Sequence, residues 1–243
     1  MITIQGKIPR NVYVAFSGGV DSMAAVDFLS RNHNVSLAHF HHDNKMADEE
    51  LDFADSVARK YGLPILVRYG DSNTPTGKSL EEHWRDQRYE FFHSINAPVI
   101  TCHHLDDCVE TYIWRMLNGT KETIPYSNQN VIRPFRLTKK SEFEYWCKKN
   151  ELDYYVDETN FDADFGVRNY IRNVLLPNAL KVNPGLHKVV RKMMINDIVA
   201  DSLAQKAWDA MYGEGYYVLQ PNERTIVNEH ILETKRDYFT AYE

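Results

Sequence analysis

A glycine turn near the start of the chain restricts its fold more than any other feature. Residues 12–16 form a short apolar run that is typical of a buried strand. The sequence Ser-Gly-Gly-Val-Asp-Ser follows directly at residues 17–22, which we call the glycine loop. Apolar residues then recur at helical spacing from Ala24 to Leu29. The segment therefore predicts a strand, a tight turn and a helix, the unit from which layered α/β folds are built.

The alternation of strands and helices continues beyond this unit. Further strands are predicted at 35–40, 63–67 and 98–102, and helices at 46–61, 79–94, 105–117, about 138–150 and 168–180. Strands that alternate with helices of this length form a parallel sheet with helices on both faces. We expect a Rossmann-like α/β domain with a twisted parallel sheet over residues 1–185, followed by a small, mainly helical C-terminal region over residues 186–243.

The composition is that of a folded protein that does not coat nucleic acid. A chain of 243 residues with 43% apolar content can bury one full core and a small second one. The formal net charge of -6 excludes indiscriminate binding to nucleic acid, which needs a broad positive potential. No apolar run is long enough to cross a membrane and the first ten residues lack a secretion signal, so we expect a cytoplasmic protein. The three scattered cysteines form neither a disulfide framework nor zinc knuckles.

The glycine loop is suited to binding phosphate. Backbone N–H groups of a glycine turn that leads into a helix form a cradle for anions, and the helix dipole favours negative charge there. Glycines allow the close approach, the serine hydroxyls add donors, and Asp21 is suited either to hold Mg²⁺ against the phosphates or to orient the loop. The predicted phosphate-binding residues are Ser17, Gly18, Gly19, Val20, Asp21 and Ser22. An ordinary turn capped by Ser17 is the alternative interpretation.

Acidic side chains at the start of another predicted helix follow the strand at 98–102. Asp106 and Glu110 lie four residues apart and Asp107 and Glu110 lie three apart, so a helix can direct these pairs to one place. Ligands of parallel sheets bind at the C-terminal ends of the strands, near this helix start. Acids that only interact with the helix dipole are the alternative interpretation.

Four histidines follow two of the predicted strands and could converge as zinc ligands: His41, His42, His103 and His104. Their spacing is not that of a regular zinc site, so we expect no structural metal. His103 and His104 are instead expected to order their loop or to contact phosphate.

The charges reverse sign along the second half of the chain. Residues 151–164 contain six acids and no base, and residues 165–196 contain six bases and no acid. Arg168 and Arg172 fall on one helical face, and arginine is suited to bidentate contacts with phosphate. With Arg133, Arg136, Lys139 and Lys140 they would form a path for RNA, and a solvated helix face is the alternative interpretation.

The glycine loop resembles that of the PP-loop ATP pyrophosphatases, which adenylate a carbonyl oxygen so that a nucleophile can displace AMP. Further segments between residues 11 and 184 resemble, in the same order, those of the tRNA(Ile)-lysidine synthetases. These segments are 38–42, the helix with Arg85, Arg88 and Tyr89, 102–111, 132–134, 157–160, 168–173 and 176–177. Several segments in order are far more specific than any one of them.

The resemblance implies a ligase that converts a cytidine of tRNA to lysidine. ATP would adenylate the C2 carbonyl oxygen of the wobble cytidine in tRNA(Ile) with a CAU anticodon, and free L-lysine would then attack C2. The wobble base would have to be unstacked to reach the nucleotide. The resemblance implies that the glycine loop and His103 bind ATP, with Mg²⁺ on Asp21. It implies catalysis by Asp21, Asp107 and Glu110, and lysine binding by Asp106, Asp107 and Glu110. The implied tRNA-binding residues are Arg133, Arg168, Asn169 and Arg172.

The chain departs from the family pattern at three places. After His42 the family usually continues Gly-Leu-Arg, whereas Asp43, Asn44 and Lys45 follow here. Residues 118–127 keep Gly119 but lack the further glycines expected there. Proteins of the family also normally contain further C-terminal modules that bind the body of the tRNA. We therefore expect a short form that recognises mainly the anticodon stem-loop, or that depends on a homodimer or on a narrow set of tRNAs.

Two other functions remain open. One is a different PP-loop enzyme, such as one that thiolates tRNA or forms an amide. Thiolation of the related type normally uses pairs of Cys-x-x-Cys motifs, which are absent here. Amide formation with glutamine as the nitrogen donor needs an extra domain. The other is a catalytically silent RNA-binding relative, against which the retained residues of the glycine loop and Asp107 and Glu110 argue. Pyrophosphate release that requires both tRNA and lysine would distinguish all three.

Overall fold

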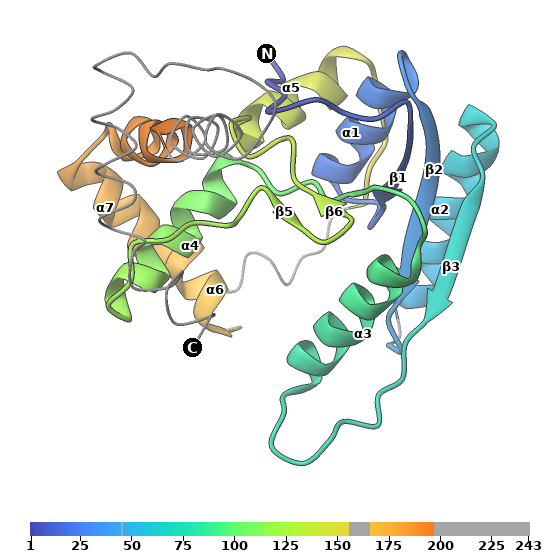
Figure 1. Ribbon diagram of the computed structural model, residues 1–243, viewed down its shortest axis with the longest axis horizontal. Coiled ribbons are helices and arrows are strands. Elements are labelled where there is room, and N and C mark those ends of the chain that lie inside the picture. The colour runs from blue at the N-terminus through green and yellow to red at the C-terminus, as the bar shows by residue number, and fades with distance from the viewer. Residues whose placement is uncertain (45, 156–165, 197–243) are drawn as a thin grey trace, which may run out of the picture. The chain divides into compact units, whose positions relative to one another are not determined.

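A sheet of mostly parallel strands forms the centre of the fold. The computed structural model describes residues 1–44, 46–155 and 166–196 (Figure 1). The six strands of the sheet formed by these residues have the order β3-β2-β1-β4-β6-β5. Their bounds are β1 Asn11–Ala15, β2 Asn34–His41, β3 Ile65–Tyr69, β4 Val99–Ile100, β5 Ser127–Asn128 and β6 Val131–Ile132. Strands β3, β2, β1, β4 and β6 run parallel, and β5 is antiparallel to β6 at the edge. The predicted parallel α/β sheet is confirmed, with one short antiparallel strand added.

Helices cover both faces of the sheet. Their bounds are α1 Val20–Ser30, α2 Ala47–Tyr61, α3 Leu80–Ser94, α4 Leu105–Leu117, α5 Lys140–Lys149, α6 Gly166–Tyr170, the π-helix η2 Ile171–Leu175 and α7 Leu176–Val182. Alternate residues of β1 point to opposite faces, as a strand requires. Val12 and Val14 belong to a core that includes residues of α1, α2 and α5. Tyr13 and Ala15 pack into a second core with Phe91 of α3.

The predicted helix at 168–180 is present but changes its geometry along its length. Residues 171–175 form a π-helix between two stretches of α-helix. Pro177 lies in the first turn of α7 and has no N–H to bond to the residue four positions earlier, which favours a local change in the turn. Such π segments are frequent at functional sites.

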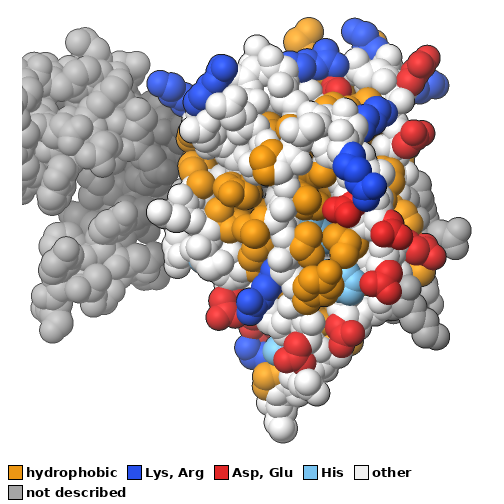
Figure 2. All heavy atoms as spheres, turned by 90° about the vertical axis from the view of Figure 1, so that its right-hand side faces the viewer, with side chains coloured by type: hydrophobic (Ala, Val, Ile, Leu, Met, Phe, Trp, Pro, Cys, Tyr) orange, Lys and Arg blue, Asp and Glu red, His pale blue; other side chains and the backbone are white. Residues whose placement is uncertain are grey.

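Strand β3 forms one edge of the sheet. Figure 2 shows the molecule from this side, with apolar side chains gathered in the middle and charged side chains around them. Leu66 and Tyr69 of β3 are among the exposed large apolar residues. Among the described residues, no helix is both long and apolar enough to span a bilayer.

The chain divides into two compact units, Met1–Pro184 and Gly185–Glu243. The described part of the second unit is helical at residues 186–196, where Val190 and Met194 are buried. The remainder of the expected helical region, residues 197–243, lies outside the described residues, as do Lys45 and most of the acidic run, residues 156–165.

Candidate active site

The glycine loop connects the end of β1 to the start of α1, as predicted. Gly18 has φ +81°, a left-handed conformation that favours glycine. A Cβ atom at this position would lie 3.1 Å from Cδ1 of Phe53 and 3.5 Å from Cβ of Tyr155. The conformation and the close neighbours both require a residue without a side chain at position 18.

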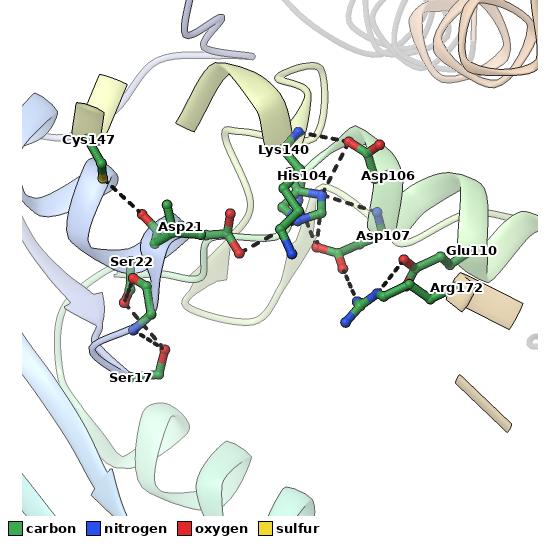
Figure 3. A network of polar contacts seen from close by, with 12 residues as sticks. Ser17, Asp21, Ser22, His104, Asp106, Asp107, Glu110, Lys140, Cys147 and Arg172 are labelled. Carbon is green, nitrogen blue, oxygen red and sulfur yellow. Dashed lines mark hydrogen bonds and ion pairs between the residues drawn. The ribbon is translucent and has the colours of Figure 1, made fainter. Parts of the chain in front are cut away.

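Two serine hydroxyls order the glycine loop (Figure 3). The hydroxyl of Ser22 donates to the carbonyl of Gly19 at 3.0 Å and lies 3.3 Å from the hydroxyl of Ser17. Gly19 precedes α1 and supplies no side-chain cap. The first N–H groups of α1 therefore keep hydrogen-bonding capacity for an anion at the positive end of the helix.

A cavity of about 240 Å³ opens beside the glycine loop. Its lining comes from the ends of β1, β2 and β4, as expected for a parallel sheet, from the helices α1, α2 and α4 that follow them, and from α3 and α6. The lining residues are Ala15, Phe16, Ser17, Asp21, Ser22, Ala38, His39, Phe40, His42, Glu50, Arg88, Tyr89, Phe92, Thr101, Cys102, His103, Asp107 and Arg168.

Asp107 and Glu110 form a buried carboxylate pair on α4. The guanidinium of Arg168 donates to Oδ1 of Asp107 at 2.7 Å and to Oε2 of Glu110 at 3.4 Å. That of Arg172 donates to both oxygens of Glu110, at 2.8 and 3.0 Å, and lies 3.5 Å from Asp107 (Figure 3). Burial raises the pKa of Asp107, but His104 and Arg168 outweigh burial and hold the pKa well below its usual range. The helical spacing thus brings the two carboxylates together, as expected, and arginine side chains pair with both.

Asp106 faces a different partner. Its Oδ2 accepts a hydrogen bond from the backbone N–H of Lys140 at 2.8 Å, which ties the start of α4 to the start of α5. This contact supports a structural role for Asp106, and its predicted role in lysine binding stays a prediction.

His104 connects the glycine loop to the carboxylate pair, and the sequence predicted that it orders its loop or contacts phosphate. Its backbone N–H donates to Oδ2 of Asp107 at 3.0 Å, and its ring caps α4 by accepting from the N–H of Asp107 at 3.3 Å. The ring nitrogens also lie 3.6 Å from Asp21, 3.7 Å from Asp106 and 3.5 Å from Asp107. Its position immediately before the helix-start acids is the sequence signal that identifies it as the cap.

The carboxylates around the ring of His104 favour its protonated form. Burial lowers its pKa, but the carboxylates of Asp107, Asp21 and Asp106 outweigh burial and raise the pKa to about 9. The hydrogen bond from the N–H of Asp107 belongs to the neutral ring, because a protonated Nδ1 cannot accept. The protonated ring directs Nδ1–H toward the carboxylates of Asp106 and Asp107 and Nε2–H toward Asp21.

The other histidines of the cavity are neutral. Burial lowers the pKa of His103 to about 3, and Nδ1 of this ring lies 2.9 Å from the hydroxyl of Thr101. Burial, and then the charge of Arg88, lower the pKa of His42 to about 4. Within the part of the chain that the structure describes, no three His, Cys, Asp or Glu side chains are arranged to hold a metal ion.

The predicted RNA-binding residues differ in their exposure. Arg133 is buried and donates to the carbonyl of Pro125 and the hydroxyl of Tyr89, and Asn169 is buried as well. The side chains of Arg168 and Arg172 are 55% and 24% exposed. The structure therefore presents Arg168 and Arg172 to solvent, whereas Arg133 stabilises the interior, and the predicted RNA contacts of all four stay predictions.

Comparison with known proteins identifies the family. The PP-loop domain family matches residues 3–179. The tRNA(Ile)-lysidine synthase of Persephonella marina is 36% identical over 72% of this chain and 42% of that protein. The enzymes of the same name from Thermotoga maritima and Staphylococcus epidermidis are 30% identical over 76% and 90% of this chain and 49% and 56% of their own length. The chain thus spans about half the length of these curated relatives. Its glycine loop, its sheet and this match agree: the chain belongs to the PP-loop domain family.

Proposed function

We propose that this protein is a tRNA(Ile)-lysidine synthetase, a ligase that uses the conversion of ATP to AMP and pyrophosphate to form a carbon–nitrogen bond. The observation that carries the proposal is that the glycine loop and Asp107 line the same cavity. An anion cradle and an ionised carboxylate at one site suit a reaction between a nucleoside triphosphate and a substrate that carries an ammonium group. The relatives named for this activity supply the substrate class.

In the first step the glycine loop holds the triphosphate of ATP. The N–H groups at the start of α1 and the hydroxyls of Ser17 and Ser22 bind the phosphate oxygens, and Arg88 and Arg168 bring positive charge to the same cavity. The C2 carbonyl oxygen of the wobble cytidine attacks the α-phosphorus, and pyrophosphate leaves. The neutral rings of His42 and His103 line the cavity without adding charge.

Asp21 fits a role in holding Mg²⁺. Its Oδ1 atom is buried and has no hydrogen-bond partner among the described residues, so this carboxylate oxygen is left for a cation. When bound, the ion would neutralise charge on the triphosphate. The protonated ring of His104 orients the same carboxylate from the side of Oδ2.

In the second step the amine of free L-lysine attacks C2 and AMP leaves. Asp107 stays ionised because of its depressed pKa, which suits it to bind an ammonium group and makes it a poor proton acceptor. We assign binding or activation of the lysine amine to Asp107 together with Glu110, which lies beside it on α4 (Figure 3). We also propose that the protein acts in the cytoplasm, where tRNA(Ile) and free lysine are available.

Nucleoside analysis tests the proposal. The full chain is incubated with ATP, L-lysine and tRNA(Ile) with a CAU anticodon, and the digested RNA is analysed by mass spectrometry for lysidine. Asp107→Asn is expected to lower the rate by about 100-fold or more, because an ionised group at the reacting centre is lost. Glu144→Gln removes an exposed carboxylate of α5 and serves as the matched control with an unchanged rate.

Two results would refute the assignment. Unchanged cytidine from a folded protein that binds ATP removes the lysidine reaction. Equal activity on a tRNA without a CAU anticodon removes the proposed substrate.

A further inference from the structure

The carboxylate pair that would receive lysine is already paired with two arginines of the protein. Asp107 and Glu110 are almost completely buried, and the guanidinium groups of Arg168 and Arg172 contact both of them. Oδ1 of Asp107 accepts from Arg168, and Oδ2 accepts from the backbone N–H of His104. Both oxygens of Asp107 are therefore occupied, and a lysine ammonium can bind at Oδ1 only in place of Arg168.

The two arginines are held unequally. Arg172 makes a bidentate pair with Glu110 through Nε and Nη2, and its side chain is mostly buried. Arg168 makes one short contact, from Nη2 to Oδ1 of Asp107, and its contact with Glu110 is longer, at 3.4 Å. More than half of the Arg168 side chain is open to solvent. Arg172 is therefore the fixed counter-ion of Glu110, and Arg168 is the partner that can leave.

We propose that Arg168 exchanges Asp107 for a backbone phosphate of the RNA substrate, and that this exchange frees Asp107 to bind the lysine ammonium. The inference rests on the proposed function and adds an order of substrate binding, in which RNA binds before lysine. The exchange replaces one cation on Asp107 by another, so the charge beside Asp107 is unchanged.

Several features favour an RNA phosphate as the new partner of Arg168. A guanidinium binds phosphate oxygens in the same fork geometry with which it binds a carboxylate. Arg133 and Arg136 are buried and donate to Tyr89 and Gln5, so they do not compete for the phosphate. Arg168 also lines the cavity beside the glycine loop, where the phosphates of ATP offer the same chemistry. The test must therefore separate RNA from nucleotide.

Equilibrium dialysis with radiolabelled L-lysine measures the exchange. The dissociation constant of lysine is determined for the full chain alone, with a non-hydrolysable ATP analogue, and with RNA of the CAU anticodon stem-loop. RNA is expected to tighten lysine binding by about tenfold or more, as a coupling between two sites requires. In Arg168→Gln, lysine should bind tightly without RNA, and RNA should have little further effect. Arg59→Gln, which removes an exposed arginine of α2, should behave like the unaltered protein.

A reciprocal measurement needs no variant. Lysine must tighten RNA binding by the same factor by which RNA tightens lysine binding. If lysine affinity is the same with and without RNA while lysidine is formed, the exchange is refuted and the proposed function stands. If the ATP analogue alone produces the full effect, RNA is not the partner of Arg168. If neither lysine binding nor lysidine is found, the proposed function itself fails.

Discussion

His104 places one positive charge among three carboxylates that belong to two parts of the site. Asp21 lies in the glycine loop, and Asp106 and Asp107 begin α4. Because the ring is buried and its pKa is raised to about 9, the charged form contributes to the stability of the folded chain. The same ring contacts both Asp21, which is proposed to hold the nucleotide, and Asp107, which is proposed to bind lysine.

The pH dependence of stability tests this role. Since the pKa of His104 is higher in the folded chain than the usual value of 6.5, its contribution is complete below about pH 6.5 and is lost as the pH rises through about 9. The difference in unfolding free energy between the unaltered protein and His104→Gln should therefore shrink by on the order of 2–3 kcal/mol between these limits. Urea unfolding at a series of pH values measures it. Parallel curves for the two proteins would show that the ring is neutral.

Three helices meet at one side chain on the face of the sheet opposite α3. Asp27 of α1 accepts hydrogen bonds from the hydroxyl of Tyr61 at the end of α2, at 3.0 Å, and from Nε1 of Trp146 in α5, at 2.9 Å. Arg31, one turn later in α1, pairs with it at 2.7 Å and lies over the Trp146 ring. Burial and the bond to Asp27 raise the pKa of Tyr61 to about 12. This network joins the helices, and none of its four side chains lines the cavity beside the glycine loop.

Removal of the shared acceptor should loosen these helices. Asp27→Ala is expected to lower the unfolding free energy by about 2–4 kcal/mol, because two partly buried donors lose their acceptor at once. Trp146→Phe removes one donor and should cost about 1 kcal/mol. Denaturant unfolding gives both values, and ATP affinity should stay unchanged in both variants. A loss of ATP binding in folded Asp27→Ala would place this network within the active site.

At the scale of the molecule, the net charge of the chain and the exposure of its arginines limit how the protein binds RNA. The net charge of -6 provides no general attraction, so binding depends on a few local bases. Arg168 and Arg172 reach solvent, whereas Arg133 is buried with partners inside the fold. Contacts with phosphate release counterions, and contacts within the protein do not.

Salt dependence of RNA binding separates these two kinds of arginine. Arg168→Gln should lower the slope of the logarithm of the binding constant against the logarithm of salt concentration by about one. Arg133→Gln should leave the slope unchanged and lower the unfolding free energy instead, because the side chain serves the interior. Fluorescence anisotropy with labelled anticodon stem-loop RNA measures the slopes. Equal reductions in both variants would contradict the assignment based on exposure.

Local patterns in the sequence were enough to predict most of the helices and strands. Strand β1, the glycine loop and α1 follow directly from an apolar run, a glycine pair and helical spacing, and the meeting of Asp107 with Glu110 follows from their separation on one helix. Strands β5 and β6 have two residues each and leave no periodic signal, so they were not predicted.

Packing between distant segments decided the rest. Arg168 meets Asp107 across 61 residues of sequence, and spacing within one element cannot predict such an ion pair. Arg133 and Arg136 looked like surface bases in the sequence and are buried in the fold. The physical reason is that periodicity and spacing report the geometry within one element, whereas burial and ion pairing depend on which elements the chain brings together.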